Sequence, residues 1–111
     1  MFAQSNLPDI GNAIKLGDAK LLGSYFDKQI DLGFSDKTYT YNKLRAEEVI
    51  QRFFTKVEPT NFVNVQRGTS SSNNTTFTIS NMTSSKGIYK VYMFFIQKNG
   101  QFVLRELRFE K

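Results

Sequence analysis

The sequence predicts an α+β domain, in which helices pack on one face of a curved, mostly antiparallel sheet. Three observations lead to this class. The 111 residues suffice for one hydrophobic core. Residues 43–58 repeat apolar side chains at helical spacing, whereas the sequence after Pro59 alternates with the period of strands. The predicted order is helix, helix, strand, strand, helix and four strands, which we interpret as three N-terminal helices packed on one sheet.

Two short helices are expected to open the domain. Pro8 suits the first turn of a helix, and Gly17 suits the position just after its end. Asp18 can accept a hydrogen bond as the N-cap of a second helix. The apolar stripe of this second helix is expected to comprise Leu21, Leu22, Tyr25 and Phe26.

Two strands and a long helix come next. Residues 30–34 alternate apolar with polar or small side chains, and residues 38–41 form a second short strand after a turn. Asn42 can cap the long helix, and Pro59 prevents it from continuing beyond Glu58. The apolar face of this helix consists of Ala46, Val49, Ile50, Phe53, Phe54 and Val57.

Four strands are expected to complete the sheet. Asn99-Gly100 predicts a tight hairpin, because a type I′ turn needs two residues with positive φ. The strands on either side are expected at residues 88–98 and 102–109, preceded by strands at 62–67 and 75–82. The phenylalanines expected in the core are Phe53, Phe54, Phe62, Phe77, Phe102 and Phe109.

The composition excludes much catalytic chemistry. The chain has no cysteine and no histidine, so it lacks thiolate or imidazole metal ligands, a cysteine nucleophile and a Ser-His-Asp triad. We expect no metal and no cofactor. The net charge is +5, but its lysines and arginines are scattered, so nucleic-acid binding is not expected. The longest apolar run, residues 91–96, is far shorter than the roughly 18 residues of a membrane span.

Several segments, in this order and spacing, resemble a bacterial family known as domain of unknown function 4783. The opening segments are residues 9–15, 17–19, 25–27 and 30–32, and the later ones are 41–47, 53–54, 87–92 and 104–110. The resemblance covers nearly all of the chain from Asp9 onward. It implies the nuclear transport factor 2-like fold, also called cystatin-like, in which helices fill the concave side of a bent sheet. It implies no activity.

The resemblance also implies export. Members of the family are expected to be periplasmic or secreted proteins of bacteria with an N-terminal signal. Phe2-Ala3-Gln4 looks like the end of such a signal, so residues 1–7 are expected to be a residual signal tail or an end added for expression. Residues 8–111 then form a single domain of the nuclear transport factor 2-like kind.

The segment 88–96 carries large apolar side chains on both faces of its strand. One face can pack against the helices. The other face then lies on the open side of the sheet, where its apolar side chains would be in water unless another surface buries them. We expect homodimer formation through this open face, and assign it to Tyr89, Val91, Met93 and Phe95. The second candidate surface is a pocket under the long helix, near Tyr39, Tyr41 and Arg105. Arg105 shares its strand parity with core-facing residues, so it is either an anchor for an anionic ligand or a side chain that extends to water at the rim of the sheet.

These expectations describe an exported, non-catalytic module that dimerises and binds a small ligand or an envelope protein. The alternative is a weak isomerase or hydratase with its site inside the cone formed by sheet and helices. Such an enzyme needs a carboxylate base in the cone, and its candidates are Asp31, Asp36 and Glu106. Glu106 is also two residues from Arg108 on the same strand, so an ion pair between them is the structural explanation.

Overall fold

The computed structural model describes residues 7–70 and 74–111. Two helices, α1 (Leu7–Lys15) and α2 (Ala19–Gly23), precede strands β1 (Phe26–Phe34) and β2 (Lys37–Asn42). Helix α3 (Lys43–Val57) follows, and then β3 (Pro59–Ser70), β4 (Thr75–Ser84), β5 (Gly87–Lys98) and β6 (Gln101–Glu110). The predicted signal end at Phe2-Ala3-Gln4 lies outside the described residues.

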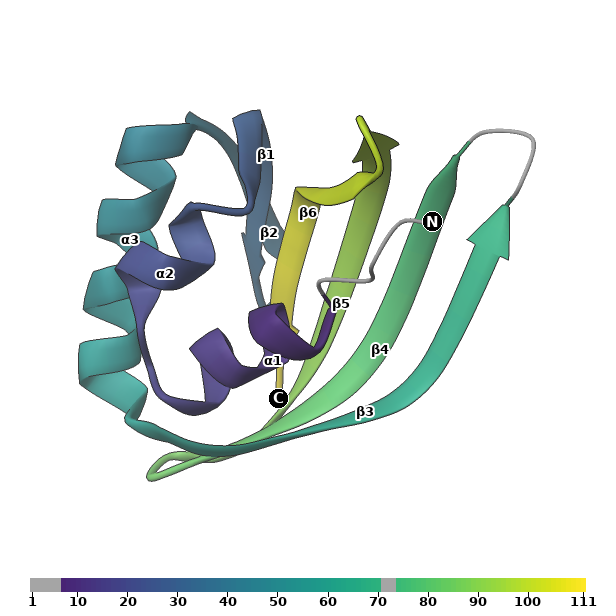
Figure 1. Ribbon diagram of the computed structural model, residues 1–111. Coiled ribbons are helices and arrows are strands. Elements are labelled where there is room, and N and C mark those ends of the chain that lie inside the picture. The colour runs from purple at the N-terminus through teal and green to yellow at the C-terminus, as the bar shows by residue number, and fades with distance from the viewer. Residues whose placement is uncertain (1–6, 71–73) are drawn as a thin grey trace.

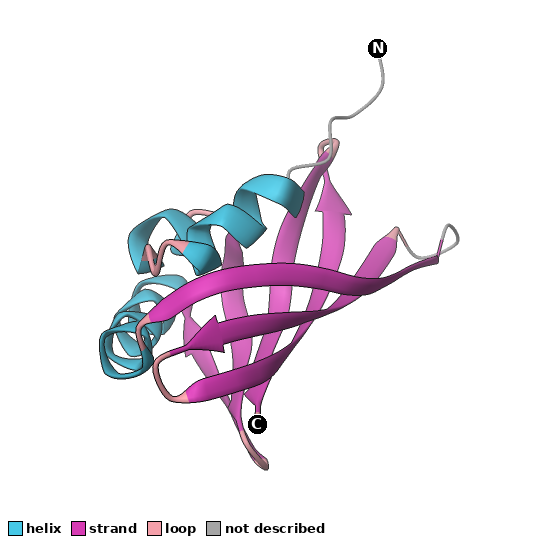
Figure 2. Cartoon of the chain, turned by 90° about the horizontal axis from the view of Figure 1, so that it is seen from below, coloured by secondary structure: helices cyan, strands magenta, loops and turns pink. Residues whose placement is uncertain are grey.

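All six strands form one curved sheet in the order β2-β1-β6-β5-β4-β3. Four of the five strand pairs are antiparallel, and β1 runs parallel to β6. The three helices lie on the concave side of the sheet (Figures 1 and 2). The α+β class is therefore confirmed. The elements follow the predicted order, with α3 between β2 and β3, so the description of three N-terminal helices does not fit exactly.

The predicted helix ends are confirmed by their capping bonds. The Leu21 N–H donates to Oδ1 of Asp18 at 3.0 Å, and the Arg45 N–H donates to Oδ1 of Asn42 at 2.8 Å. Gly17 has a φ of 67°, the left-handed conformation that glycine adopts without steric cost after a helix. Among the described residues, no helix is long and apolar enough to cross a membrane.

The second helix is shorter than its apolar stripe predicts. It ends at Gly23, and Phe26 is the first residue of β1. Phe26 is buried, as its apolar side chain suggests, but it reaches the core from strand β1 and not from the helix. The backbone N–H of Leu104 donates to the carbonyl of Tyr25 at 2.8 Å, which joins the start of β1 to β6. Tertiary pairing with β6 thus overrides the local helical spacing.

The core lies between the helices and the concave face of the sheet. Phe109 of β6 is surrounded by aromatic rings, with centroids 4.7 Å from Phe53, 6.0 Å from Phe34 and 6.2 Å from Phe54. Ala46, Ile50, Phe54 and Val57 form the buried side of α3. This arrangement confirms the helical apolar face that the sequence predicts.

A β-bulge at Arg105 determines which face of β5 meets the core. The Asn99-Gly100 hairpin, with φ values of 52° and 77°, pairs Lys98 with Gln101. That register persists to Phe95 and Leu104, but the next pair is Phe94 with Glu106. Arg105 is therefore the extra residue of a bulge, which shifts the register by one and exchanges the faces of β6 beyond it.

Candidate functional site

The residues assigned to the open face of the sheet lie in the core instead. Val91, Met93 and Phe95 are buried, and Tyr89 packs edge-on against Phe53 with ring centroids 5.5 Å apart. The physical reason is the bulge at Arg105. It places Val91 opposite Phe109 and Met93 opposite Leu107, so these side chains share the core face of β6. Our assignment of the open face to these four residues is therefore wrong.

The open, convex face carries the alternate side chains of β5 together with those of β4. Phe94 stands directly opposite Phe77, and Tyr92 stands opposite Ile79. Phe77 and Phe94 are 42% and 38% exposed, although the sequence predicted Phe77 to be in the core. We call these four residues, Phe77, Ile79, Tyr92 and Phe94, the convex strip.

Residues 76–80 of β4 have the reverse of the usual amphipathic pattern, whereas Met82, farther along the concave side, belongs to the core. The convex side of this segment carries Phe77 and Ile79, and its concave side carries Thr76, Thr78 and Ser80, all of which are buried. The hydroxyl oxygens of Thr78 and Ser80 have no hydrogen-bond partner among residues 7–70 and 74–111. A buried hydroxyl without a partner lowers the free energy of unfolding by about 1–3 kcal/mol. An exposed phenylalanine side chain does not contribute the free energy that its burial would provide. Both faces of β4 therefore differ from the arrangement that would give the highest stability.

Polar and charged groups border the convex strip on β6. Glu106 is opposite Phe94, and Arg108 is opposite Tyr92 with its guanidinium carbon 5.7 Å from the ring centroid. Arg108 forms its ion pair with Glu110, so the expected pair between Arg108 and Glu106 does not form. On the other side of the strip, a Cβ at Gly68 would lie only 2.1 Å from a ring carbon of Phe77. Glycine there leaves room for that ring to lie across β3.

A groove of about 440 Å³ lies between α1 and β3. Its floor includes Phe62, and Gly11 allows the close approach, since a Cβ there would be 3.0 Å from the Phe62 ring. Asn64 and Arg67 of β3 also line it, directly opposite Ser80 and Thr78 respectively. A bulge at Val65 keeps Asn64 and Arg67 on the same concave face. The hydroxyls of Thr78 and Ser80 thus lie on β4, the strand next to β3, and on the same concave face as the groove.

The structure does not bring the three predicted ligand residues together. Tyr39 and Tyr41 are paired with Leu32 and Ile30, on the helix-facing side of the sheet, with their own rings 6.3 Å apart. Arg105 lies at its bulge on the other side of the sheet, with half of its side chain exposed. Arg105 does not share the face of Leu107 and Phe109, because the bulge interrupts the alternation of side chains along β6.

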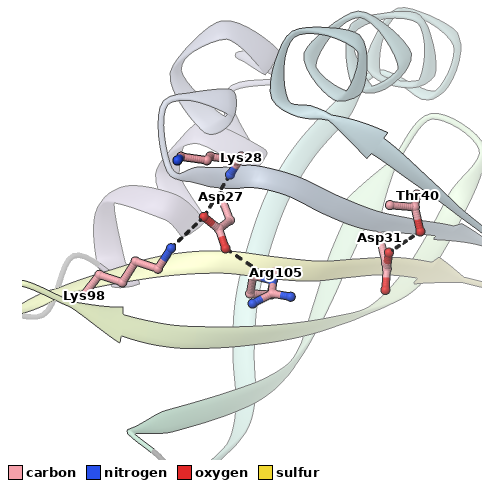
Figure 3. Close-up of polar contacts among 6 residues, drawn as sticks. All are labelled: Asp27, Lys28, Asp31, Thr40, Lys98 and Arg105. Atoms are coloured by element: carbon pink, nitrogen blue, oxygen red, sulfur yellow. Dashed lines mark hydrogen bonds and ion pairs between the residues drawn. The ribbon is translucent and has the colours of Figure 1, made fainter.

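Arg105 forms an ion pair with Asp27, a residue for which the sequence offered no signal. The Arg105 Nε atom is 3.3 Å from Oδ2 of Asp27, and the Lys98 Nζ atom donates to Oδ1 at 3.0 Å (Figure 3). Lys98 and Asp27 are 71 residues apart in the chain, so only the fold brings them together. Farther along β1, Asp31 accepts a hydrogen bond from Thr40 at 2.6 Å.

The carboxyl group of Asp27 is held in its charged form. Burial raises the pKa of Asp27. The hydrogen bonds from Lys98 and from the Lys28 N–H, together with the charges of Lys98 and Arg105, lower this pKa by more than burial raises it. The net result is a pKa below the ordinary value for aspartate. Asp27 is therefore a negative charge at neutral pH, with two cations fixed against it.

Comparison with known proteins agrees with this architecture. A family model described as domain of unknown function (DUF4783) matches residues 7–110. No curated protein matches the chain significantly. A DUF4783 family protein from Bacteroides uniformis has a similar structure, with a TM-score of 0.87, 24% identity, and coverage of 96% of this chain and 97% of its own.

Two further solved structures extend the likeness. A DUF4783 family protein from Bacteroides ovatus has a TM-score of 0.86 and 24% identity, over 92% of this chain and 91% of its own. A nuclear transport factor 2-like protein of unknown function from Cytophaga hutchinsonii has a TM-score of 0.64 and 8% identity, over 93% and 83% of the two chains. The chain belongs to the DUF4783 family, a family of unknown function, and has the nuclear transport factor 2-like fold.

Proposed function

We propose that this chain is a non-catalytic binding domain that pairs with a second copy of itself through the convex strip. The observation that carries the proposal is the reversed pattern of residues 76–80 in β4, which exposes Phe77 and leaves Ile79 half-buried on the open face while it buries hydroxyl groups. Two neighbouring apolar pairs on one open face give a continuous patch, and such patches on soluble proteins are typical of interaction sites.

A second copy is the occupant that the charges at the border of the strip favour. Glu106 and Arg108 stand two residues apart on β6, and Glu106 has no ion-pair partner among residues 7–70 and 74–111. A twofold axis places the same surface on both subunits, so Glu106 of one copy can face Arg108 of the other, which would then be shared with Glu110 of its own chain. The strip therefore complements itself in both hydrophobicity and charge.

The positions of the carboxylates support a non-catalytic role. The alternative, an isomerase or hydratase, requires a carboxylate base in the cone. Asp31 and Glu106 are paired on the convex side of the sheet, and Asp36 is in the exposed turn between β1 and β2. The described residues that line the groove between α1 and β3 include no carboxylate.

Sedimentation velocity tests self-association. We expect the unmodified chain to form dimers between about 1 and 100 μM, and Phe94→Ser to weaken the dimer by about tenfold or more, because truncating a central aromatic removes a large part of interface energy. Leu44→Ser is the control, since Leu44 is 76% exposed on α3, away from the strip. A monomer at every concentration, or a Phe94→Ser dimer as stable as the unmodified one, would contradict the proposal.

The groove between α1 and β3 is a second candidate site, for a small molecule with an apolar body and an acidic group. The unpartnered hydroxyls of Thr78 and Ser80 favour it, since they lie on the same concave face as Arg67. Phe62 offers apolar contact, and Arg67 forms no ion pair with the described residues.

Phenylacetate is a suitable probe of the groove, followed by amide chemical shifts in NMR. We expect saturable shifts at Gly11, Asn64 and Arg67, and Arg67→Gln should weaken binding by about fivefold or more, because it removes a charge-assisted hydrogen bond. Arg52→Gln, an exposed change on α3, removes the same charge elsewhere. Equal losses in the two variants, or shifts confined to other surfaces, would exclude the groove.

A further inference from the structure

A second polar site, separate from the convex strip and the groove, surrounds Asp27. A pocket of about 360 Å³ is lined by Asp27, Lys28, Gln29, Lys98 and Arg105. These residues come from the start of β1 and from the β5–β6 hairpin, so two segments distant in sequence, with Asp27 and Lys98 71 residues apart, build one pocket (Figure 3). Three cations thus line it with only one carboxylate.

In this pocket the carboxylate of Asp27 is more buried than the cations of Lys98 and Arg105. The Asp27 side chain is 12% exposed, whereas those of Lys98 and Arg105 are each 49% exposed. Both oxygens of Asp27 are already engaged, Oδ1 by Lys98 and by the Lys28 N–H at 2.8 Å, and Oδ2 by Arg105. Lys98 and Arg105 are consequently held in place while about half of each side chain still faces solvent.

Arg105 is oriented to make further contacts. It reaches Asp27 through Nε, and its two Nη groups make no hydrogen bond or ion pair with the described residues. Figure 3 shows the terminal nitrogens of the guanidinium on the side away from Asp27. Because an arginine fork can bind two oxygens of one anion, a guanidinium fixed along its Nε edge retains donors for a ligand.

The net charge of the pocket favours an anionic ligand. The three cations and Asp27 leave two positive charges in the pocket, and Lys43 adds another in the adjoining pocket that shares Asp27, Lys28 and Lys98. The hairpin that carries Lys98 supplies no carboxylate, since the sequence has no acidic residue between Glu58 and Glu106. Asp31, the next acid on β1, is bonded to Thr40.

We propose that the pocket formed by Lys28, Lys98 and Arg105 around Asp27 binds a dianionic phosphate group, either free phosphate or the phosphate of a small monoester. The two surplus charges match a dianion, and guanidinium and ammonium donors are the groups that bind phosphate oxygens in proteins. Asp27 prepares the site, because it fixes two flexible side chains before the ligand arrives.

Isothermal titration calorimetry of the full chain at constant ionic strength tests this site, with inorganic phosphate in one arm and phenyl phosphate in the other. We expect saturable binding with a Kd of about 1 mM or below in at least one arm. Binding of inorganic phosphate identifies the free ion as sufficient, and tighter binding of phenyl phosphate identifies the monoester as the preferred form. Absence of saturable binding in both arms would overturn the proposal.

Matched variants distinguish this pocket from general attraction to a basic protein. Arg105→Gln and Lys98→Gln should each weaken binding by about tenfold or more, since each removes charge-assisted hydrogen bonds. Lys20→Gln removes the same charge at an exposed position of α2 and should leave affinity unchanged. Equal weakening in all three variants would show that net charge alone attracts phosphate. Because the substituted side chains are half exposed, circular dichroism should give the same fold for each.

Discussion

Replacement of Phe109 by alanine is expected to lower the free energy of unfolding by about 3–5 kcal/mol. Phe109 is 1% exposed and packs against three other phenylalanine rings, one from β1 and two from α3. Its strand pairs with both β1 and β5, so a cavity there affects the centre of the sheet and its contact with the helices together. Domains of this kind are stable by only about 5–15 kcal/mol, so the variant should approach the limit of folding.

Urea denaturation followed by circular dichroism measures this loss. Phe109→Leu keeps most of the side-chain volume and should cost less than about 1.5 kcal/mol. Phe77→Ala is the informative comparison, because Phe77 is the same residue type on the convex face and much of its ring is already in water. Its loss should be well below that of Phe109→Ala. Similar losses at the two positions would mean that Phe77 is a core residue, contrary to the orientation of β4 described above.

Replacement of Thr78 by valine, or of Ser80 by alanine, is expected to stabilise the domain by about 1–3 kcal/mol per site. Both side chains are fully buried, and their hydroxyl oxygens lack partners in the part of the chain that the structure describes. Valine has nearly the shape of threonine and carries no polar atom, so the desolvation cost disappears while packing is retained. Each kcal/mol should raise the melting temperature by about 4–8 °C in a domain of this size.

Thr83→Val provides the control on the same strand. Thr83 is exposed on the convex side of β4, so its substitution should change stability by less than about 0.5 kcal/mol. Differential scanning calorimetry of the three variants gives the comparison. A loss of stability in Thr78→Val and Ser80→Ala would show that the hydroxyls are bonded in solution. A gain would show that these polar groups are retained at a cost to stability, as expected for residues kept for a ligand.

Local signals were sufficient to predict most elements of the fold. Asn42 and Pro59 bracket α3 because capping and the lack of a proline N–H act within a few residues. Asn99-Gly100 determined the last hairpin, since its two positive φ values are a property of the dipeptide itself. Where such local chemistry governs the backbone, prediction and structure agree.

The site was harder to predict, because it depends on register and on distant contacts. The apolar pattern of β5 is equally suited to either face, and only the bulge at Arg105 assigns Val91 to the core and Phe94 to the convex side. A one-residue shift exchanges every side chain between the faces of a strand. Asp27 has no local pattern that marks it, since its partners Lys98 and Arg105 arrive from the other end of the chain.

The central claim is that β4 and β5 direct phenylalanine side chains away from the core, to a face that a second copy covers. Proton relaxation by a soluble gadolinium chelate measures this directly on assigned aromatic rings. In dilute protein, the rings of Phe77 and Phe94 should relax strongly and that of Phe109 weakly; in concentrated protein, Phe77 and Phe94 should become protected. Rings of Phe77 and Phe94 as protected as Phe109 at low concentration, or accessible to the chelate at every concentration, would contradict the account.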